Sequence, residues 1–135
     1  MSAEENKAIS NRVAQAIGKG DLDAFDELMA RELAEEFKRE VAEIRRAFPD
    51  YSGANVDQIA EGEKVANRFV FLGTHLGDFE GVAPTGKRVE FVGASIDRVV
   101  DGKIVENWVE VDMLGVMQQL GAVPEAGQSE GASPT

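Results

Sequence analysis

The dipeptide Asp101-Gly102 constrains the fold of this chain more than any other feature. It lies between two stretches rich in Val and Ile, SIDRVV and KIVENWVEV. Asp-Gly favours the positive φ angles of a type I′ turn, which joins two adjacent antiparallel strands. We therefore predict a β-hairpin whose strands span residues 88–99 and 103–112.

Two helical segments are predicted before the strands. In the first, apolar residues recur every three or four positions, and Ser2 and Glu5 fit a capping box at its start. In the second, over 22–48, the same spacing continues without an internal Gly or Pro. This segment is either one long helix or two helices with a kink near Ala30.

Val, Phe and Ile recur at alternate positions from residue 56 onward, which predicts strands over 56–61 and 64–75. The longer strand carries large apolar side chains on both faces. This pattern is typical of a sheet covered on both sides, by helices or by a second subunit. A short helix is predicted over 114–120.

The order of these elements indicates the α+β class, with N-terminal helices packed on one face of a curved, mostly antiparallel sheet. Residues 1–121 are predicted to form one domain. Residues 122–135 are rich in Gly, Pro, Ser and Glu, and we expect a disordered tail there. A curved sheet of this kind leaves a cavity between itself and the helices.

Charge and composition exclude several classes of function. The chain has 25 acidic and 14 basic residues, a net charge of −11, which repels nucleic acids and anionic membranes. It has no Cys and a single His, which excludes thiolate catalysis, cysteine zinc sites and multi-histidine metal sites. We expect no metal and no cofactor. The first residues lack the pattern of a signal peptide, so the expected location is the cytoplasm.

Side chains alternate in direction along a strand, so the strand after the turn has two different faces. Its carboxylates share one face with the only Trp of the chain. We predict that this face lines a pocket and that the opposite face packs as an ordinary sheet. The predicted pocket face holds Ile104, Glu106, Trp108, Glu110 and Asp112, and the opposite face holds Val105, Asn107, Val109 and Val111.

Several motifs together resemble one known family, the SnoaL-like polyketide cyclases, also called ester cyclases, of the NTF2-like superfamily. The resemblance covers roughly residues 5–121 and implies a cone-shaped α+β fold. The motifs are AFPD (47–50), IAEGEKV (59–65), Arg68, GTH (73–75), Gly77, Phe79, Gly81, PTGKRVEF (84–91), IDR (96–98), DGKIVE (101–106), Trp108, Asp112 and QQLG (118–121).

The resemblance implies an intramolecular aldol condensation on a small apolar carbonyl compound, without metal or cofactor. It places the general acid/base at Asp112, on the last strand. Burial would raise the pKa of such a carboxyl, and Glu110 on the same face would raise it further. Asp112 also fits an N-cap of the final helix, and Glu110 fits a solvated carboxylate.

Four further side chains are candidates for contact with the ligand: Arg98, Trp108, His75 and Arg68. Each has a structural alternative. Arg98 could pair with Glu106 or Glu110 across the hairpin, and Arg68 with one of the same carboxylates. Trp108 could be a core aromatic, and His75 could hold the edge of a loop.

The chain departs from the family pattern between the second and third helices. Family members usually carry a short strand and a loop there, but the segment over 28–50 keeps a helical pattern throughout. We expect a more open cavity, or one closed by another chain. A long fused helix also favours a homodimer, with exchanged N-terminal helices as a variant.

Two alternative functions stay open at this point. One is a hydrolase or isomerase on the same fold, such as an epoxide hydrolase that uses Arg98, Asp112 and Glu110. The other is a non-catalytic module for small-ligand binding or dimerisation.

Overall fold

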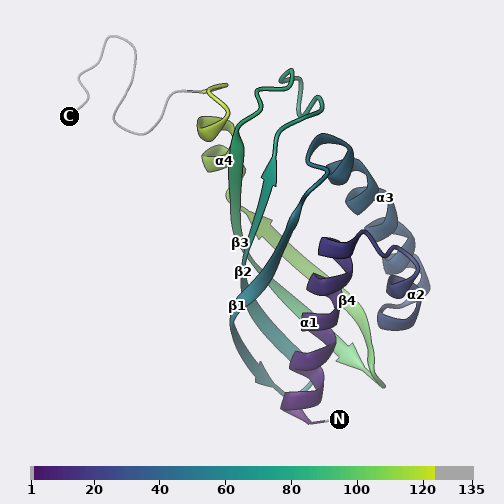
Figure 1. The fold of residues 1–135 in the computed structure, drawn as a ribbon. Helices are drawn as coiled ribbons and strands as arrows, with labels where there is room; N and C mark the ends of the chain where they lie inside the picture. The colour runs from purple at the N-terminus through teal and green to yellow at the C-terminus, as the bar shows by residue number, and fades with distance from the viewer. Residues whose placement is uncertain (1, 124–135) are drawn as a thin grey trace, which may run out of the picture.

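The strands form one curved antiparallel sheet, and helices cover its concave face (Figure 1). This structure is a computed structural model, and it describes residues 2–123. The α+β prediction is confirmed. The four strands are β1 (Ser52–Glu61), β2 (Lys64–Thr74), β3 (Arg88–Val100) and β4 (Lys103–Val111), paired in that order.

In the described part of the chain, three helices precede the strands in the sequence, and one follows them. Helix α1 (Ala3–Lys19) crosses the concave face next to β1, and α2 (Ala24–Leu28) and α3 (Arg31–Ala47) lie beside it. Helix α4 (Met113–Gln119) follows β4 and packs at the other end of the sheet, near the start of β3. The predicted capping box is confirmed: the Ser2 hydroxyl accepts from the Glu5 amide, and the Glu5 carboxylate accepts from the Ser2 amide.

The segment predicted as one long helix or two is two helices, so the alternative with a break near Ala30 is correct. Met29 adopts an extended conformation and forms a parallel bridge with Ile104 of β4. The Ala30 amide donates to the Ile104 carbonyl at 2.8 Å. Met29 is buried in the core, so this break is part of the packing between helices and sheet.

The predicted hairpin is confirmed, with positive φ angles of 50° at Asp101 and 80° at Gly102. The pairing then shifts, because Val99 pairs with Ile104 whereas Arg98 pairs with Glu106. Val105 is therefore an extra residue in β4, a β-bulge. A bulge reverses the alternation of side chains, so the residues after it face the opposite way from the prediction.

The core has two parts along the sheet. One lies where α2 and α3 pack on the ends of the strands, around Phe25, Leu28, Met29, Val65, Val99 and Ile104. The other lies toward α4, around Phe48, Phe69, Phe71, Val89, Phe91 and Val116. The helices leave space between these two parts, over the middle of the concave face.

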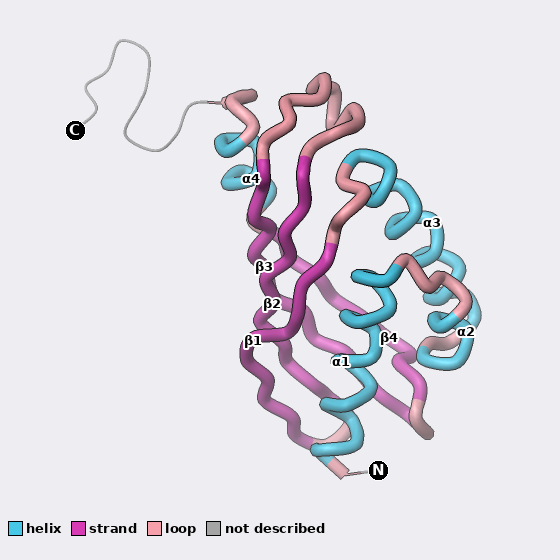
Figure 2. The backbone as a smooth tube through the Cα atoms, in the orientation of Figure 1, coloured by secondary structure: helices cyan, strands magenta, loops and turns pink. Residues whose placement is uncertain are grey.

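In the described chain, α1, α2 and α3 cover the concave face of the sheet, and α4 lies beside the edge of β3, so no helix covers the convex face (Figure 2). The convex face carries Val70 and Leu72, which are half-buried, and Ile96 and Trp108, which are exposed. The prediction that helices cover both faces is therefore wrong, and cover by a second subunit stays a prediction. Most of the predicted tail, from residue 124, lies outside the described residues. Within residues 2–123, no helix is long and apolar enough to cross a membrane.

Candidate functional site

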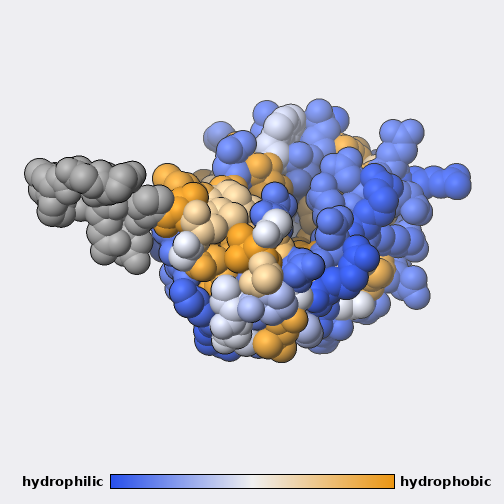
Figure 3. Space-filling model, turned by 90° about the horizontal axis from the view of Figure 1, so that it is seen from above, coloured by the Kyte–Doolittle hydropathy of each residue, from blue (hydrophilic) through white to orange (hydrophobic). Residues whose placement is uncertain are grey.

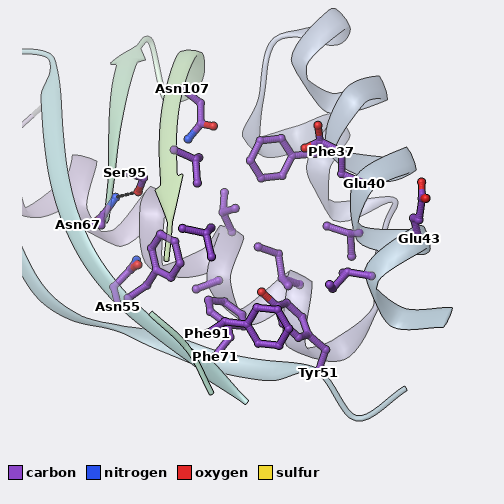
Figure 4. Close-up of a pocket in the computed structure, with 18 of the residues that line it drawn as sticks. Phe37, Glu40, Glu43, Tyr51, Asn55, Asn67, Phe71, Phe91, Ser95 and Asn107 are labelled. Atoms are coloured by element: carbon purple, nitrogen blue, oxygen red, sulfur yellow. Dashed lines mark hydrogen bonds between the residues drawn. The ribbon is translucent and has the colours of Figure 1, made fainter. Parts of the chain in front are cut away.

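A cavity of about 590 Å³ lies between the concave face of the sheet and helices α1 and α3 (Figure 4). Its walls are mostly aromatic and aliphatic. The sheet contributes Phe69, Phe71 and Phe91, and the helices contribute Val13, Ile17, Phe37 and Ile44. Such walls suit a flat apolar ligand, and the volume is in the range of sites for small molecules.

One carboxyl group reaches this apolar space from the sheet. Asp97 of β3 is only 5% exposed. Its Oδ2 accepts from the Ser10 hydroxyl of α1 at 2.7 Å and from the Asn67 amide of β2 at 3.1 Å. Its Oδ1 accepts from the Asn107 side-chain amide of β4 at 2.6 Å. Three different elements therefore hold this carboxyl group in place.

A second set of hydrogen bonds fixes the direction of Asn67. Its side-chain oxygen accepts from the Gln58 amide of β1 at 2.8 Å, so its NH₂ group must face Asp97 and Ser95 (Figure 4). The Gln58 oxygen in turn accepts from Asn11 of α1 at 3.0 Å. The donors around Asp97 are thus oriented before any ligand binds.

The pKa of Asp97 is raised above its ordinary value. Burial is the main cause, because it disfavours the charged form. The hydrogen bonds from Asn107, Ser10 and Asn67 act in the opposite direction and lower the pKa. Burial outweighs them, so Asp97 takes up a proton more readily than a carboxylate in water.

The mouth of the cavity is open and acidic. Val109 and Met113 line the cavity and are 42% and 39% exposed, so the space opens beside β4 and the start of α4. Four exposed carboxylates also line it, Glu40 and Glu43 of α3 and Asp78 and Glu80 of the loop after β2. No Lys, Arg or His is among the described residues that line it.

Comparison with known proteins places this geometry in a family. The model of the SnoaL-like polyketide cyclase family matches residues 7–120. The chain belongs to the SnoaL-like polyketide cyclase family. A search of curated protein sequences finds no match.

Solved structures agree with this SnoaL-like assignment and confirm the predicted NTF2-like cone. AclR from Streptomyces galilaeus, to which a hydroxylase activity is attributed, is 29% identical with a TM-score of 0.83, over 92% of this chain and 85% of AclR. IdmH from Streptomyces antibioticus, described as a polyketide cyclase, is 28% identical with a TM-score of 0.77, over 90% of this chain and 99% of IdmH. A protein from Acidithiobacillus ferrooxidans with the same description is 25% identical with a TM-score of 0.78, over 90% and 98% of the two chains.

In this SnoaL-like chain, Asp112 does not line the cavity, so the predicted orientation is wrong. The side chain is exposed and accepts from the Gly115 amide at 2.9 Å, as the N-cap of α4. The alternative prediction of an N-cap is therefore confirmed. Its two neighbours, Val111 and Met113, do line the cavity.

The other predicted residues of the hairpin lie on the convex face of the sheet. Glu110 and Trp108 lie there because of the bulge at Val105, and Arg98 lies there because it alternates with the buried Asp97 and Val99 on β3. Glu110 and Trp108 are exposed there, and the Lys64 ammonium lies 5.6 Å from the Trp108 ring centre. Arg98 pairs with Glu106, as its structural alternative predicted, and also with Glu63 at 3.1 Å. None of these side chains touches the cavity.

Arg68 and His75 also lie outside the cavity lining. Arg68 is exposed on the convex face, and the described residues offer it no ion pair. His75 is fully buried at the start of the loop after β2, stacked on Phe48 with ring centres 5.3 Å apart. Its Nδ1 accepts from the Thr85 amide at 3.1 Å, so His75 holds that loop, as its alternative predicted.

Sequence reasoning missed Asp97, Asn67, Asn107 and Ser10 as a group. One signal could have found Asp97, because it alternates with Val99 and Phe91 on a strand face that must be buried. A carboxylate on such a face needs partners or a function. The partners themselves come from three other elements, and only the fold brings them together.

Proposed function

We propose that this protein is a cyclase-type enzyme that closes a carbon–carbon bond within a small carbonyl compound, with Asp97 as the general acid/base. Membership of the polyketide cyclase family supports a cyclase-type role. The observation that carries the assignment is the position of Asp97, a buried carboxyl group held by three donors inside an apolar cavity. This assignment replaces Asp112 by Asp97 as the acid/base.

The proposed reaction begins when a carbon flanked by two carbonyl groups lies against Asp97. A carboxylate offers about four acceptor positions, and three are occupied by Ser10, Asn67 and Asn107. The remaining one takes the proton from this carbon. The resulting enolate carbon attacks a second carbonyl group of the same molecule, and a carbon–carbon bond forms. Asp97 returns the proton to the new alkoxide, so no cofactor is needed for the balance.

The charges around the cavity support an uncharged substrate. Four carboxylates at the mouth repel anions, and none of the described lining residues is basic. Apolar walls favour an aromatic or alicyclic compound. Together these features support the predicted ligand, a small apolar carbonyl compound.

The pH dependence of proton abstraction tests the assignment. Asp97 must be ionised to act as a base, and its pKa is raised by burial. We expect kcat/KM to fall as the pH is lowered through an apparent pKa above ~3.9, the ordinary value for Asp. The measurement is exchange of the acidic C–H of ethyl benzoylacetate in D₂O, followed by NMR. An acid limb at the ordinary value, or the same limb in Asp97→Asn, would contradict the proposal.

The same assay separates the alternative functions. An isomerase that uses Asp97 as a base would catalyse exchange but close no ring on a longer poly-β-keto compound, and a hydrolase that uses Asp97 to activate water would do neither. A non-catalytic binding module would bind the ester without accelerating exchange. Ring closure with loss of the exchangeable C–H distinguishes the cyclase from both.

We also propose that the chain forms a homodimer through the convex face of the sheet. Ile59, Ala66, Ile96 and Trp108 are paired neighbours across all four strands, and Ile59 and Trp108 are 71% and 49% exposed. A continuous exposed apolar row is typical of an interface. Exchange of N-terminal helices has lost its basis, because α2 and α3 are separate helices.

The dimer is tested by Trp108→Glu, which places a charge in the middle of this row. We expect a dimer mass for the wild type and a monomer mass for the variant at micromolar concentration, measured by light scattering. Leu76→Glu is the matched control, because Leu76 is exposed on the loop after β2, where its amide donates to the Ala47 carbonyl at the end of α3. A monomeric wild type would refute the dimer, and a dimeric Trp108→Glu would refute this interface.

A further inference from the structure

We propose that the Tyr51 hydroxyl donates a hydrogen bond to an oxygen atom of the ligand at the end of the cavity away from Asp97. The residue thereby selects ligands that carry an acceptor oxygen at that position. The proposal rests on the proposed function for the identity of the reaction, but it concerns binding and can be tested without turnover. Tyr51 follows helix α3 and lines the cavity.

Aromatic contacts hold the Tyr51 ring in one orientation. It stacks on Phe71 with ring centres 5.0 Å apart and an angle of 18° between the planes. Phe91 meets the same ring edge-on, at 5.1 Å and 85°. Both partners are buried on the concave face of the sheet. A ring held on two sides can place its hydroxyl group with little freedom.

The backbone of Tyr51 is held as firmly as the ring. The Arg45 guanidinium donates to the Tyr51 carbonyl at 2.6 Å and to the Pro49 carbonyl at 3.0 Å. It also donates to the carbonyls of Ile17 and Gly18 at the end of α1, both at 3.2 Å. One side chain thus ties α3, α1 and the segment before β1 together, and the Tyr51 hydroxyl is positioned in advance.

The hydroxyl itself is left without a partner in the protein. No described residue accepts from or donates to it, and it points from the aromatic end into the cavity (Figure 4). Burial raises the pKa of Tyr51, so the phenol stays neutral and remains a donor. Tyr51 is half-buried and lines the cavity, so an acceptor oxygen of a ligand can reach the hydroxyl and form one hydrogen bond with it.

Apart from the carboxylates at its mouth, the cavity has polar groups near Asp97 and at Tyr51, with aromatic and aliphatic walls between them. Asn67, Ser95 and Asn107 mark the Asp97 end, and Tyr51 marks the other (Figure 4). Asn67 and Phe71, the stacking partner of Tyr51, are four residues apart on β2, which is ~13 Å along a strand. A ligand that reaches both ends is elongated, with an acceptor oxygen far from the carbon that loses its proton.

The test compares two probes of the same shape, 2-acetylnaphthalene and 2-isopropylnaphthalene, which differ in the acceptor oxygen. We expect Tyr51→Phe to weaken binding of the ketone about 3- to 10-fold, the effect of losing one neutral hydrogen bond. Binding of the hydrocarbon should change by less than about 2-fold, since Phe keeps the ring contacts. Dissociation constants from probe fluorescence give both values, and the thermal midpoint confirms the fold of the variant.

A spectroscopic readout accompanies the binding constants. The carbonyl stretching band of the bound ketone should lie at lower frequency in the wild type than in Tyr51→Phe, because a donated hydrogen bond weakens the C=O bond. The proposal would be overturned if Tyr51→Phe lost the same affinity for both probes or lost none for the ketone. It would also be overturned if the wild type bound neither probe. Failure of the proposed reaction would be a separate result. In that case Asp97→Asn would keep its turnover, while Tyr51→Phe would still weaken binding of the ketone more than binding of the hydrocarbon.

Discussion

Asp97→Asn is expected to lower kcat/KM for proton exchange by about 10²- to 10⁴-fold, the usual contribution of a positioned general acid/base. The amide has nearly the shape of the carboxyl group but cannot accept the proton. Ligand binding should be retained within a few fold, because the aromatic walls of the cavity are unchanged. The measurement is the exchange rate of ethyl benzoylacetate together with its dissociation constant.

The matched control for this experiment is Asp112→Asn. Asn caps a helix about as well as Asp, so the bond to the Gly115 amide can be kept. We expect exchange rates close to wild type in this variant. Loss of exchange in Asp112→Asn, with wild-type rates in Asp97→Asn, would return the acid/base role to the residue that the family resemblance implies.

The fold of Asp97→Asn must be checked separately, because its amide NH₂ would face donors from Ser10, Asn67 or Asn107. Ser10→Ala provides a second variant that keeps the carboxyl group. It removes one donor that lowers the pKa of Asp97, so the acid limb of the pH profile should move to higher pH. A limb that stays in place would show that Asp97 is not the group that titrates.

Phe48→Ala is expected to lower the free energy of unfolding by about 3–5 kcal/mol, the range for removal of a buried aromatic ring. Phe48 is fully buried where α3 ends. Its ring contacts Phe91, Phe79 and His75, with centres 5.0, 5.1 and 5.3 Å away. The loss would be a large part of the total for a domain of this size. Urea unfolding followed by fluorescence measures it.

The control for this prediction is Leu76→Ala. Leu76 is exposed and follows His75, one of the residues that the Phe48 ring contacts. A surface truncation of this kind changes the free energy of unfolding by less than about 0.5 kcal/mol. Similar effects of the two substitutions would mean that Phe48 is not a centre of the core. The surface beside α4 also carries a group of apolar side chains (Figure 3).

Features that depend on neighbouring residues were predictable from the sequence. The turn at Asp101-Gly102 follows from the φ angles that these two residues tolerate. The start of α1 follows from hydrogen bonds between Ser2 and Glu5. The resemblance to a family added the overall architecture, which no local pattern specifies.

Features that depend on distant partners were not predictable in the same way. The sequence left one long helix or two helices open over 22–48, and the hydrogen bond from the Ala30 amide to the distant Ile104 carbonyl decides for two. The bulge at Val105 arises from how β3 and β4 pair, and Val105 itself is an ordinary strand residue. Without that bulge, Glu106, Trp108 and Glu110 would face the concave side as predicted, so one shift in pairing explains the misplaced residues of β4.

The bulge at Val105 also bears on how such chains diverge. A deletion of one residue between Val99 and Glu106 would turn the rest of the hairpin over and exchange an amide for a carboxylate and an indole at the substrate. Two homologues could then be nearly identical in this motif and still place different functional groups against the compounds they bind. Sequence alignments of these hairpins therefore need to count gaps as carefully as substitutions when functions are transferred between genes.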